Sequence, residues 1–119
     1  IKAIENPYTT IMGHLTGRLL LRRKGYPVDH KKIIDACAAN GVAIEINANP
    51  WRLDIDWRHI PYAMEKGVML SINPDAHNIP GIDDIQYGVM AANKGGANKE
   101  LILNAKSRDE VATYFKSGK

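Results

Sequence analysis

Three apolar runs, each followed by a polar loop, divide the chain into repeating units. The runs lie at residues 9–12, 42–46 and 68–72, and such continuous apolar runs are expected of strands that are covered on both faces. Apolar residues recur at helical spacing between and after them. The pattern therefore predicts the order strand, helix, strand, helix, strand, helix. That order is typical of parallel strands joined by crossover helices, so we expect an α/β fold.

Local signals mark the ends of the first two predicted helices. Asp29 is a good N-cap and Gly41 a good stop for the first helix. The second helix begins near Trp57, provided that Pro61 lies in its first turn, and it ends at Gly67.

Three further helix starts are expected after the third strand. One carries an apolar face over residues 82–92 and is closed by a pair of glycines. Asn98 marks another possible helix start. Ser107 and Glu110 form a capping box, which predicts a last helix over about residues 107–117.

The composition limits the class of protein without identifying it. A chain of 119 residues with 45% apolar and 24% charged residues is enough for one modest soluble domain. The net charge of +3 permits an anionic partner but does not require one. The single cysteine, Cys37, forms no internal disulfide and fits a reducing compartment. No apolar run has the length of a membrane span, so we expect a cytoplasmic protein.

The first residues suggest a piece of something larger. The chain begins at Ile1 without a methionine, and residues 1–5 resemble the end of a helix cut within the element. We expect a single fragment that extends over residues 1–119. The alternative is a processed terminus.

The loops after the three strands hold the candidate chemistry. One loop contains His14, another contains Asp75 and His77, and the third spans residues 45–52. In α/β folds, ligands bind at the carboxyl ends of the strands. Carboxylate and imidazole groups are common ligands of Zn²⁺, Mn²⁺ or Fe²⁺, and two residues apart in an extended segment they point to the same face. The alternative is a capping aspartate beside a surface histidine.

Two arginines have two possible roles. Arg18 and Arg52 could each hold a phosphate with a bidentate guanidinium. They could equally form ion pairs with Glu45, Asp54 or Asp56 at the rim of the fold.

Two polar residues of the second strand and one basic run also have alternative readings. Glu45 needs a partner if it points inward, either an arginine or a metal ligand that it supports. Asn47 could orient ligands through hydrogen bonds, or it could build a turn. The basic residues 22–24, with Lys31 and Lys32, could follow a DNA backbone, but a solvated face is the preferred interpretation.

Three segments carry a family resemblance. They are GHLTGRLLLRRKGYPVDHKKIIDACAANG, VAIEINANPWRLDIDW and GVMLSINPDAHNIPGIDDIQYGVMAANKGG. Together they resemble the polymerase and histidinol phosphatase (PHP) domain, in the version found at the C-terminus of bacterial family X DNA polymerases. The resemblance covers about residues 9–104, and the combination of EINANPxRLD, DAH and YGV in this order is specific.

The resemblance implies a fold and a metal site. The fold would be the C-terminal portion of a seven-stranded β/α barrel similar to a TIM barrel. Up to three divalent ions, Mn²⁺ or Zn²⁺, would bind at its C-terminal face, with His14, Asp75 and His77 among the ligands. The family's other ligands would precede Ile1, so we expect an incomplete ligand set and no activity from the chain alone.

The resemblance also implies a function in the full-length protein. That function is the hydrolysis of DNA phosphodiesters by a metal-bound water, as 3′–5′ exonuclease or end processing beside nucleotide polymerisation. The expected partners are DNA, the missing half of the barrel and a polymerase domain. The alternatives are a histidinol-phosphatase-type monoesterase and a non-catalytic structural or interaction module.

Half of a barrel is expected to associate with itself. The side chains of Ile44, Ile46, Leu70 and Ile72 are expected inside a closed barrel, and half a barrel would expose them together with two strand edges. We therefore predict a dimer. The alternative is that the terminal helices fold over the open side.

Overall fold

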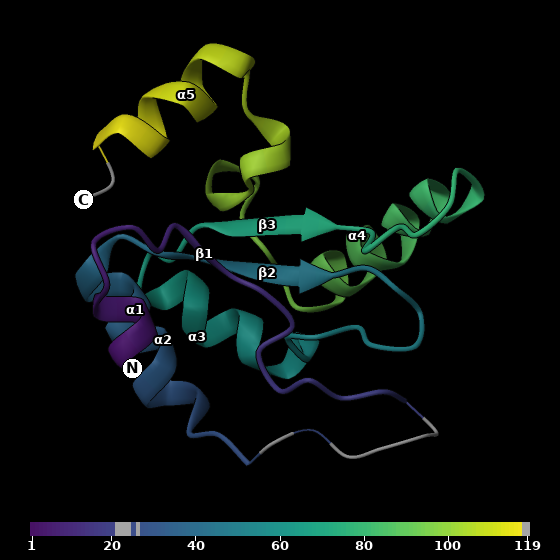
Figure 1. The fold of residues 1–119 in the computed structure, drawn as a ribbon, viewed down its shortest axis with the longest axis horizontal. Coiled ribbons are helices and arrows are strands. Elements are labelled where there is room, and N and C mark those ends of the chain that lie inside the picture. Colours follow the sequence, from purple (N-terminus) through teal and green to yellow (C-terminus); the bar gives the residue numbers. More distant parts are fainter. Residues whose placement is uncertain (21–24, 26, 118–119) are drawn as a thin grey trace.

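The computed structural model describes residues 1–20, 25 and 27–117 of the chain (Figure 1). A parallel sheet forms its centre, with the strands in the order β1 (Ile11–Met12), β2 (Ala43–Asn47) and β3 (Leu70–Asn73). The parallel strands and the helices between them confirm the α/β fold predicted from the sequence.

Helices and short 3-10 turns connect and follow the strands. The helices are α1 (Lys2–Glu5), α2 (His30–Asn40), α3 (Ile60–Glu65), α4 (Ile85–Lys94) and α5 (Arg108–Ser117). The 3-10 turns are η1 (Trp57–His59), η2 (Pro80–Asp84), η3 (Lys99–Leu101) and η4 (Leu103–Ala105). Among the described residues, no helix is long and apolar enough to cross a membrane.

The predicted helix ends are confirmed. The Asp29 side chain accepts a hydrogen bond from the Lys32 backbone N–H at 3.2 Å and caps α2. Gly41 ends α2 with a φ of 66°, a left-handed conformation that glycine adopts without strain. At α5, the Ser107 Oγ accepts from the Glu110 N–H at 3.2 Å, and the Glu110 carboxylate accepts from the Ser107 N–H at 3.0 Å. This pair is the predicted capping box.

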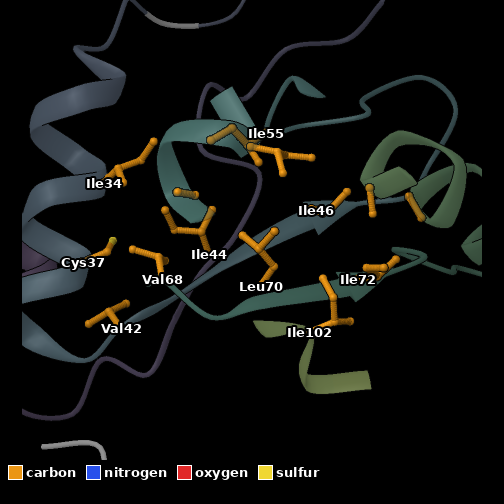
Figure 2. Packing of buried hydrophobic residues seen from close by; sticks show 14 of the residues in the cluster. Ile34, Cys37, Val42, Ile44, Ile46, Ile55, Val68, Leu70, Ile72 and Ile102 are labelled. Atoms are coloured by element: carbon orange, nitrogen blue, oxygen red, sulfur yellow. The ribbon is translucent and has the colours of Figure 1, made fainter. Parts of the chain in front are cut away.

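The core lies between one face of the sheet and the helices that cover it. Ile44, Ile46 and Leu70 are fully buried there, packed with Ile34 of α2 and Ile60 at the start of α3. Figure 2 shows the strand side chains and Ile34 pointing into one cluster. Burying an aliphatic side chain of this size contributes about 1.5–3 kcal/mol. This one face therefore supplies most of the apolar burial.

One expectation about the sheet is wrong. Ile44, Ile46, Leu70 and Ile72 were expected to face the inside of a barrel and to be exposed in a half-barrel, but they are buried in the core of this chain. Side chains alternate between the two faces of a strand, and the helices of the chain itself cover the face that these residues occupy. The opposite face carries the alternate residues of β2, which are Ala43, Glu45 and Asn47.

The outer edge of β3 is partly closed by the segment that follows α4. Ile102 forms a single parallel bridge with Leu70. The Asn104 side chain accepts from the Ile72 N–H and donates to the Ile72 carbonyl, both at 2.8 Å. Its carboxamide therefore takes the place of a neighbouring strand at Ile72.

The last helix lies on the side of the sheet opposite α2 and α3. Figure 1 shows α5 above the strands and the other two helices below them. The Tyr114 hydroxyl lies 3.4 Å from the Gly41 carbonyl, and a cavity of about 300 Å³ is lined by Ile11, Ser71, Val111 and Phe115, with two residues of the η4 segment. The terminal helix therefore lies over the face of the sheet opposite the buried side chains of Ile44 and Leu70.

Candidate active site at the strand ends

The three strands run in parallel, so their carboxyl ends meet at one edge of the sheet. His14 lies two residues after β1, Asn47 is the last residue of β2, and Asp75 lies two residues after β3. The sheet therefore brings together loops that are about thirty residues apart in the sequence.

Glu45 connects these three strand ends. Its Oε1 accepts from the His14 backbone N–H at 3.0 Å and from the Asn47 side-chain amide at 3.1 Å. Its Oε2 accepts from the Asn73 side-chain amide at 2.8 Å. The partners of this carboxylate are neutral N–H groups, and one of them is the backbone N–H of the predicted metal ligand His14. Among the described residues, no arginine forms an ion pair with Glu45.

Asn47 extends the network to Asp75. Its side-chain amide also lies 3.3 Å from the Asp75 Oδ2, which forms an ion pair with the Arg52 Nε at the same distance of 3.3 Å. The Asn47 Oδ1 accepts from the Asn49 N–H at 3.1 Å. Asn47 therefore builds the turn after β2, and its amide also binds two carboxylates, one of which belongs to the predicted ligand Asp75.

His77 is held in a defined orientation. Its Nδ1 lies 2.8 Å from the Asp75 carbonyl oxygen. A carbonyl only accepts hydrogen bonds, so Nδ1 must carry the hydrogen in this contact. In the neutral ring, Nε2 is then left with a free lone pair, which is the arrangement commonly found in metal-binding histidines.

Backbone strain is concentrated in the same loops. Among the described residues, the non-glycine residues with positive φ are His14 (22°), Leu53 (43°) and Asp75 (53°). Such conformations are uncommon for residues other than glycine, and they cluster at functional sites. Two of the three are predicted metal ligands.

Arg18 forms the ion pair that was considered for it. Its Nη1 lies 3.1 Å from the Asp56 Oδ2, its Nε donates to the Arg52 carbonyl at 2.7 Å, and its Nη2 donates to the Leu53 carbonyl. Hydrogen bonds from Arg58 and, to a smaller extent, from Arg18 hold the pKa of Asp56 well below its usual range. Arg18 thus fixes the loop after β2.

Arg52 is bound less completely. Its Nε pairs with Asp75, while its Nη1 is buried and has no hydrogen-bond partner among the described residues. A buried donor without an acceptor is unfavourable. Of the two predicted phosphate-binding arginines, Arg52 is therefore the one with a buried N–H donor that lacks an acceptor among the described residues.

The predicted metal ligands are brought together only in part. Asp75 and His77 are in contact, whereas His14 is connected to the network through its backbone N–H to Glu45. In the part of the chain that the structure describes, no three His, Cys, Asp or Glu side chains lie close enough to hold a metal ion.

Sequence reasoning missed two residues of this region. One is Asn73, which pairs in register with Asn47. The signal that could have indicated Asn73 is the presence of polar residues at alternate positions of an otherwise apolar strand. Asp54, considered only as an ion-pair partner, has its Oδ2 hydrogen-bonded to the loop after His14. Its contacts are 37 and 38 residues away in the sequence, so no local pattern indicates them.

The basic residues 22–24 lie outside the described residues. Lys31 and Lys32, which were grouped with them, are exposed at the start of α2.

The fold and the strand-end network define a parallel α/β unit with a polar site at the carboxyl edge of its sheet. No family model matches the chain. It is 44% identical over 114 residues to the DNA polymerase/3′-5′ exonuclease PolX of Bacillus subtilis, which covers 96% of this chain and 20% of that protein. This similarity confirms the predicted resemblance to the PHP part of bacterial family X DNA polymerases.

Proteins named as probable phosphatases are also similar. One from Thermoanaerobacter sp. (strain X514) is 26% identical over 100% of this chain and 48% of its own length. Another, from Caldanaerobacter subterraneus, is 28% identical over 97% of this chain and 45% of its own length. The chain therefore spans about a fifth of the polymerase and about half of the phosphatases.

Proposed function

We propose that this chain forms part of a metal-dependent phosphoesterase site that hydrolyses DNA phosphodiesters in a longer protein, as a 3′–5′ exonuclease. The observation that carries the proposal is the network at the strand ends, in which Glu45 and Asp75 are joined by Asn47 beside the oriented ring of His77. The similarity to a protein named DNA polymerase/3′-5′ exonuclease supports DNA as the substrate. The three-stranded unit would then belong to a seven-stranded barrel.

His14, Asp75 and His77 are the proposed metal ligands. The donor set fits a divalent ion, because the free Nε2 of His77 and the carboxylate of Asp75 are of the type that Mn²⁺ and Zn²⁺ prefer. Divalent ions at this place would supply Lewis acidity at the phosphoryl group. The described residues gather fewer than three such side chains at one point, so we propose that they contribute ligands to a shared site.

Arg52 is the proposed phosphate-binding residue. Its guanidinium is anchored to Asp75 through Nε, and its Nη1 has no acceptor in the described residues. A phosphate oxygen beside Asp75 would provide that acceptor. Arg18 is proposed to support it, since its Nε holds the Arg52 carbonyl.

The test separates hydrolysis from polymerisation in the full-length protein. Asp75→Ala or His77→Ala should abolish metal-dependent exonuclease activity and leave nucleotide incorporation largely intact. Asp83→Ala, which removes an exposed carboxylate on η2, is the matched control and should keep both activities. Exonuclease rates within a few-fold of wild type for Asp75→Ala would refute the assignment.

Hydrolysis of phosphomonoesters is the second candidate, because three similar proteins are named probable phosphatases. The two functions differ in their substrate. An exonuclease degrades 3′-recessed DNA and leaves histidinol phosphate intact, whereas a monoesterase does the reverse. A protein that hydrolyses neither with Mn²⁺ or Zn²⁺ would be the non-catalytic module.

We also propose that the chain alone is inactive. The described residues hold no cluster of three potential ligands. Catalytic metal sites generally need at least three protein ligands. The purified chain should show no nuclease or phosphatase turnover with Mn²⁺ or Zn²⁺. Substantial hydrolysis of 3′-recessed DNA by the chain, lost in His14→Ala, would overturn this.

Self-association of the chain remains a prediction, now supported by a different surface. Ile79, just before η2, is 83% exposed and Met90 of α4 is 64% exposed, and Ile82 and Val89 between them in the sequence are also exposed. Clustered exposed apolar side chains often mark an interface. Sedimentation at micromolar concentration provides the test, because a stable monomer of 13.2 kDa would contradict the prediction.

A further inference from the structure

The carboxylate of Asp54 is completely buried, with no exposed surface. Its Oδ2 accepts hydrogen bonds from the Thr16 backbone N–H at 2.8 Å, from the Thr16 hydroxyl at 2.7 Å and from the Gly17 N–H at 3.1 Å. All three donors belong to the loop that begins with His14. One oxygen of a single carboxylate therefore holds this loop.

A buried carboxylate is unfavourable unless its charge is compensated. No ion pair of Asp54 is found within the described ranges, so the N–H and O–H groups of the loop provide the compensation. The other oxygen, Oδ1, is buried and has no hydrogen-bond partner among these residues. The cost of burying this carboxylate is thus offset by hydrogen bonds at only one of its two oxygens. Those hydrogen bonds hold the loop after β1 in position.

The backbone of Asp54 is fixed to β2. Its carbonyl accepts from the Asn47 N–H at 2.6 Å, and the next residue, Ile55, donates its N–H to the Glu45 carbonyl at 3.3 Å. Asp54 therefore connects β2, through its backbone, to the loop after β1, through its side chain.

His14 is held between two carboxylates as a result. Glu45 binds its backbone N–H at 3.0 Å, and Asp54 binds the two residues that close its turn, in which the Gly17 N–H donates to the His14 carbonyl at 2.9 Å. His14 has a φ of 22°, so its backbone needs contacts of this kind to stay in place.

We propose that Asp54 and Thr16 are positioning residues, which hold the loop so that the His14 side chain is oriented to bind a metal ion. The proposal rests on the proposed function, in which His14 binds a metal. Asp54 touches neither metal nor substrate in this arrangement. It acts through the Thr16 hydroxyl and the turn that fixes the direction of the His14 side chain.

Gly25 supports the same arrangement from the other side of Thr16. A Cβ atom at Gly25 would lie 2.5 Å from the Thr16 Oγ1 and 2.6 Å from its Cβ, which is closer than real atoms approach. Gly25→Ala would therefore displace Thr16 from Asp54 without changing either residue. It should reproduce the effect of removing the Thr16 hydroxyl.

The experiment measures Co²⁺ binding to the full-length protein, by titration and by the visible absorption of the bound ion. Thr16→Val, Asp54→Asn and Gly25→Ala should weaken binding by about 10–100-fold and change the absorption spectrum. Thr16→Ser keeps the hydroxyl and should bind within about threefold of wild type. Asp35→Asn, at an exposed carboxylate on α2, is the matched control. If Asp54→Asn does not fold, the comparison of Thr16→Val with Thr16→Ser still decides.

His14→Ala separates this proposal from the one on which it rests. If His14→Ala weakens Co²⁺ binding but Thr16→Val and Asp54→Asn retain wild-type affinity and spectrum, the positioning role is overturned alone. If His14→Ala leaves binding unchanged, the proposed metal site and the positioning role both fail. Equal losses in Thr16→Val and Thr16→Ser would also overturn the proposal, because the hydroxyl would then not matter.

Discussion

The two faces of β2 differ in both chemistry and packing. Ile44 and Ile46 point into the core and are fully buried, whereas Glu45 and Asn47, at the alternate positions, join the network at the strand ends. Four consecutive residues thus serve two purposes, separated by the two-residue period of the strand. The difference teaches that stability and chemistry can be altered separately in this strand.

The two faces should also respond differently to substitution. The core side loses both transfer free energy and packing when a side chain is shortened. The network side consists of hydrogen bonds at a partly exposed edge, each of which contributes about 0.5–1.5 kcal/mol. Substitutions on the core side should therefore lower the stability of the chain. Substitutions on the network side should mainly change the binding of the proposed metal ion.

The largest effect is expected from the core side. Ile44→Ala should lower the free energy of unfolding by about 2–5 kcal/mol, because a fully buried side chain leaves a cavity. Glu45→Gln, at the adjacent position on the other face, keeps the size of the side chain and should cost less than about 1.5 kcal/mol. Urea unfolding of the two variants measures both values. Equal losses of unfolding free energy in the two variants would show that the core side does not contribute more to stability than the network side.

An intermediate effect is expected where α4 crosses the ends of β2 and β3. A Cβ atom at Gly88 would lie 2.5 Å from the Ile72 Cγ2 and 2.7 Å from the Ala48 Cβ. Gly88→Ala should therefore destabilise the fold by about 1–3 kcal/mol through overpacking. This would happen although alanine favours a helix over glycine by about 1 kcal/mol.

The control for Gly88 is an exposed position on the same helix. Gln86 is exposed on α4, so Gln86→Ala should change the free energy of unfolding by less than about 0.5 kcal/mol. A Gly88→Ala variant that is more stable than wild type would mean that helix propensity outweighs the contact with β3. The apolar face would then tolerate a rearrangement of α4.

The sequence predicted the elements well because their signals are local. Asp29, Gly41 and the Ser107 capping box act within a few residues, and the structure has each of them as expected. The surroundings of the strand side chains were predicted wrongly, because a barrel interior was expected and the helices of the chain cover them instead. The apolar residues of a strand show that a face is buried, but they do not show whether helices or a barrel interior cover it.

The candidate site was predicted by residue type rather than by contact. The strand-end position of His14, Asp75 and Asn47 follows from the parallel sheet, so these residues could be found from the sequence. The hydrogen bonds that the Asp54 carboxylate accepts and the one that the Asn73 amide donates could not, since they join residues that are 28 to 38 positions apart. Such contacts are set by the packed fold.

The smallest effect is expected from a histidine pair on the helix side of the molecule. The rings of His30, at the start of α2, and His59, at the end of η1, are stacked with centroids 3.7 Å apart and planes 7° apart. Burial and the charge of His30 lower the pKa of His59, as Arg58 and Arg18 do to a smaller extent, while Asp56 opposes them.

The sign of the pH dependence follows from this shift. A histidine whose pKa is lower in the folded state than in the unfolded state, about 6.5, binds fewer protons when folded. Its contribution to stability is therefore complete above about pH 6.5 and is lost as the pH falls from there toward the lower folded value. Urea unfolding at pH 7.5 and pH 5.5 should show a lower midpoint at pH 5.5, and His59→Gln should reduce that difference. If His59→Gln leaves the difference unchanged, other groups set the pH dependence, and the stacked pair does not connect α2 to η1 energetically.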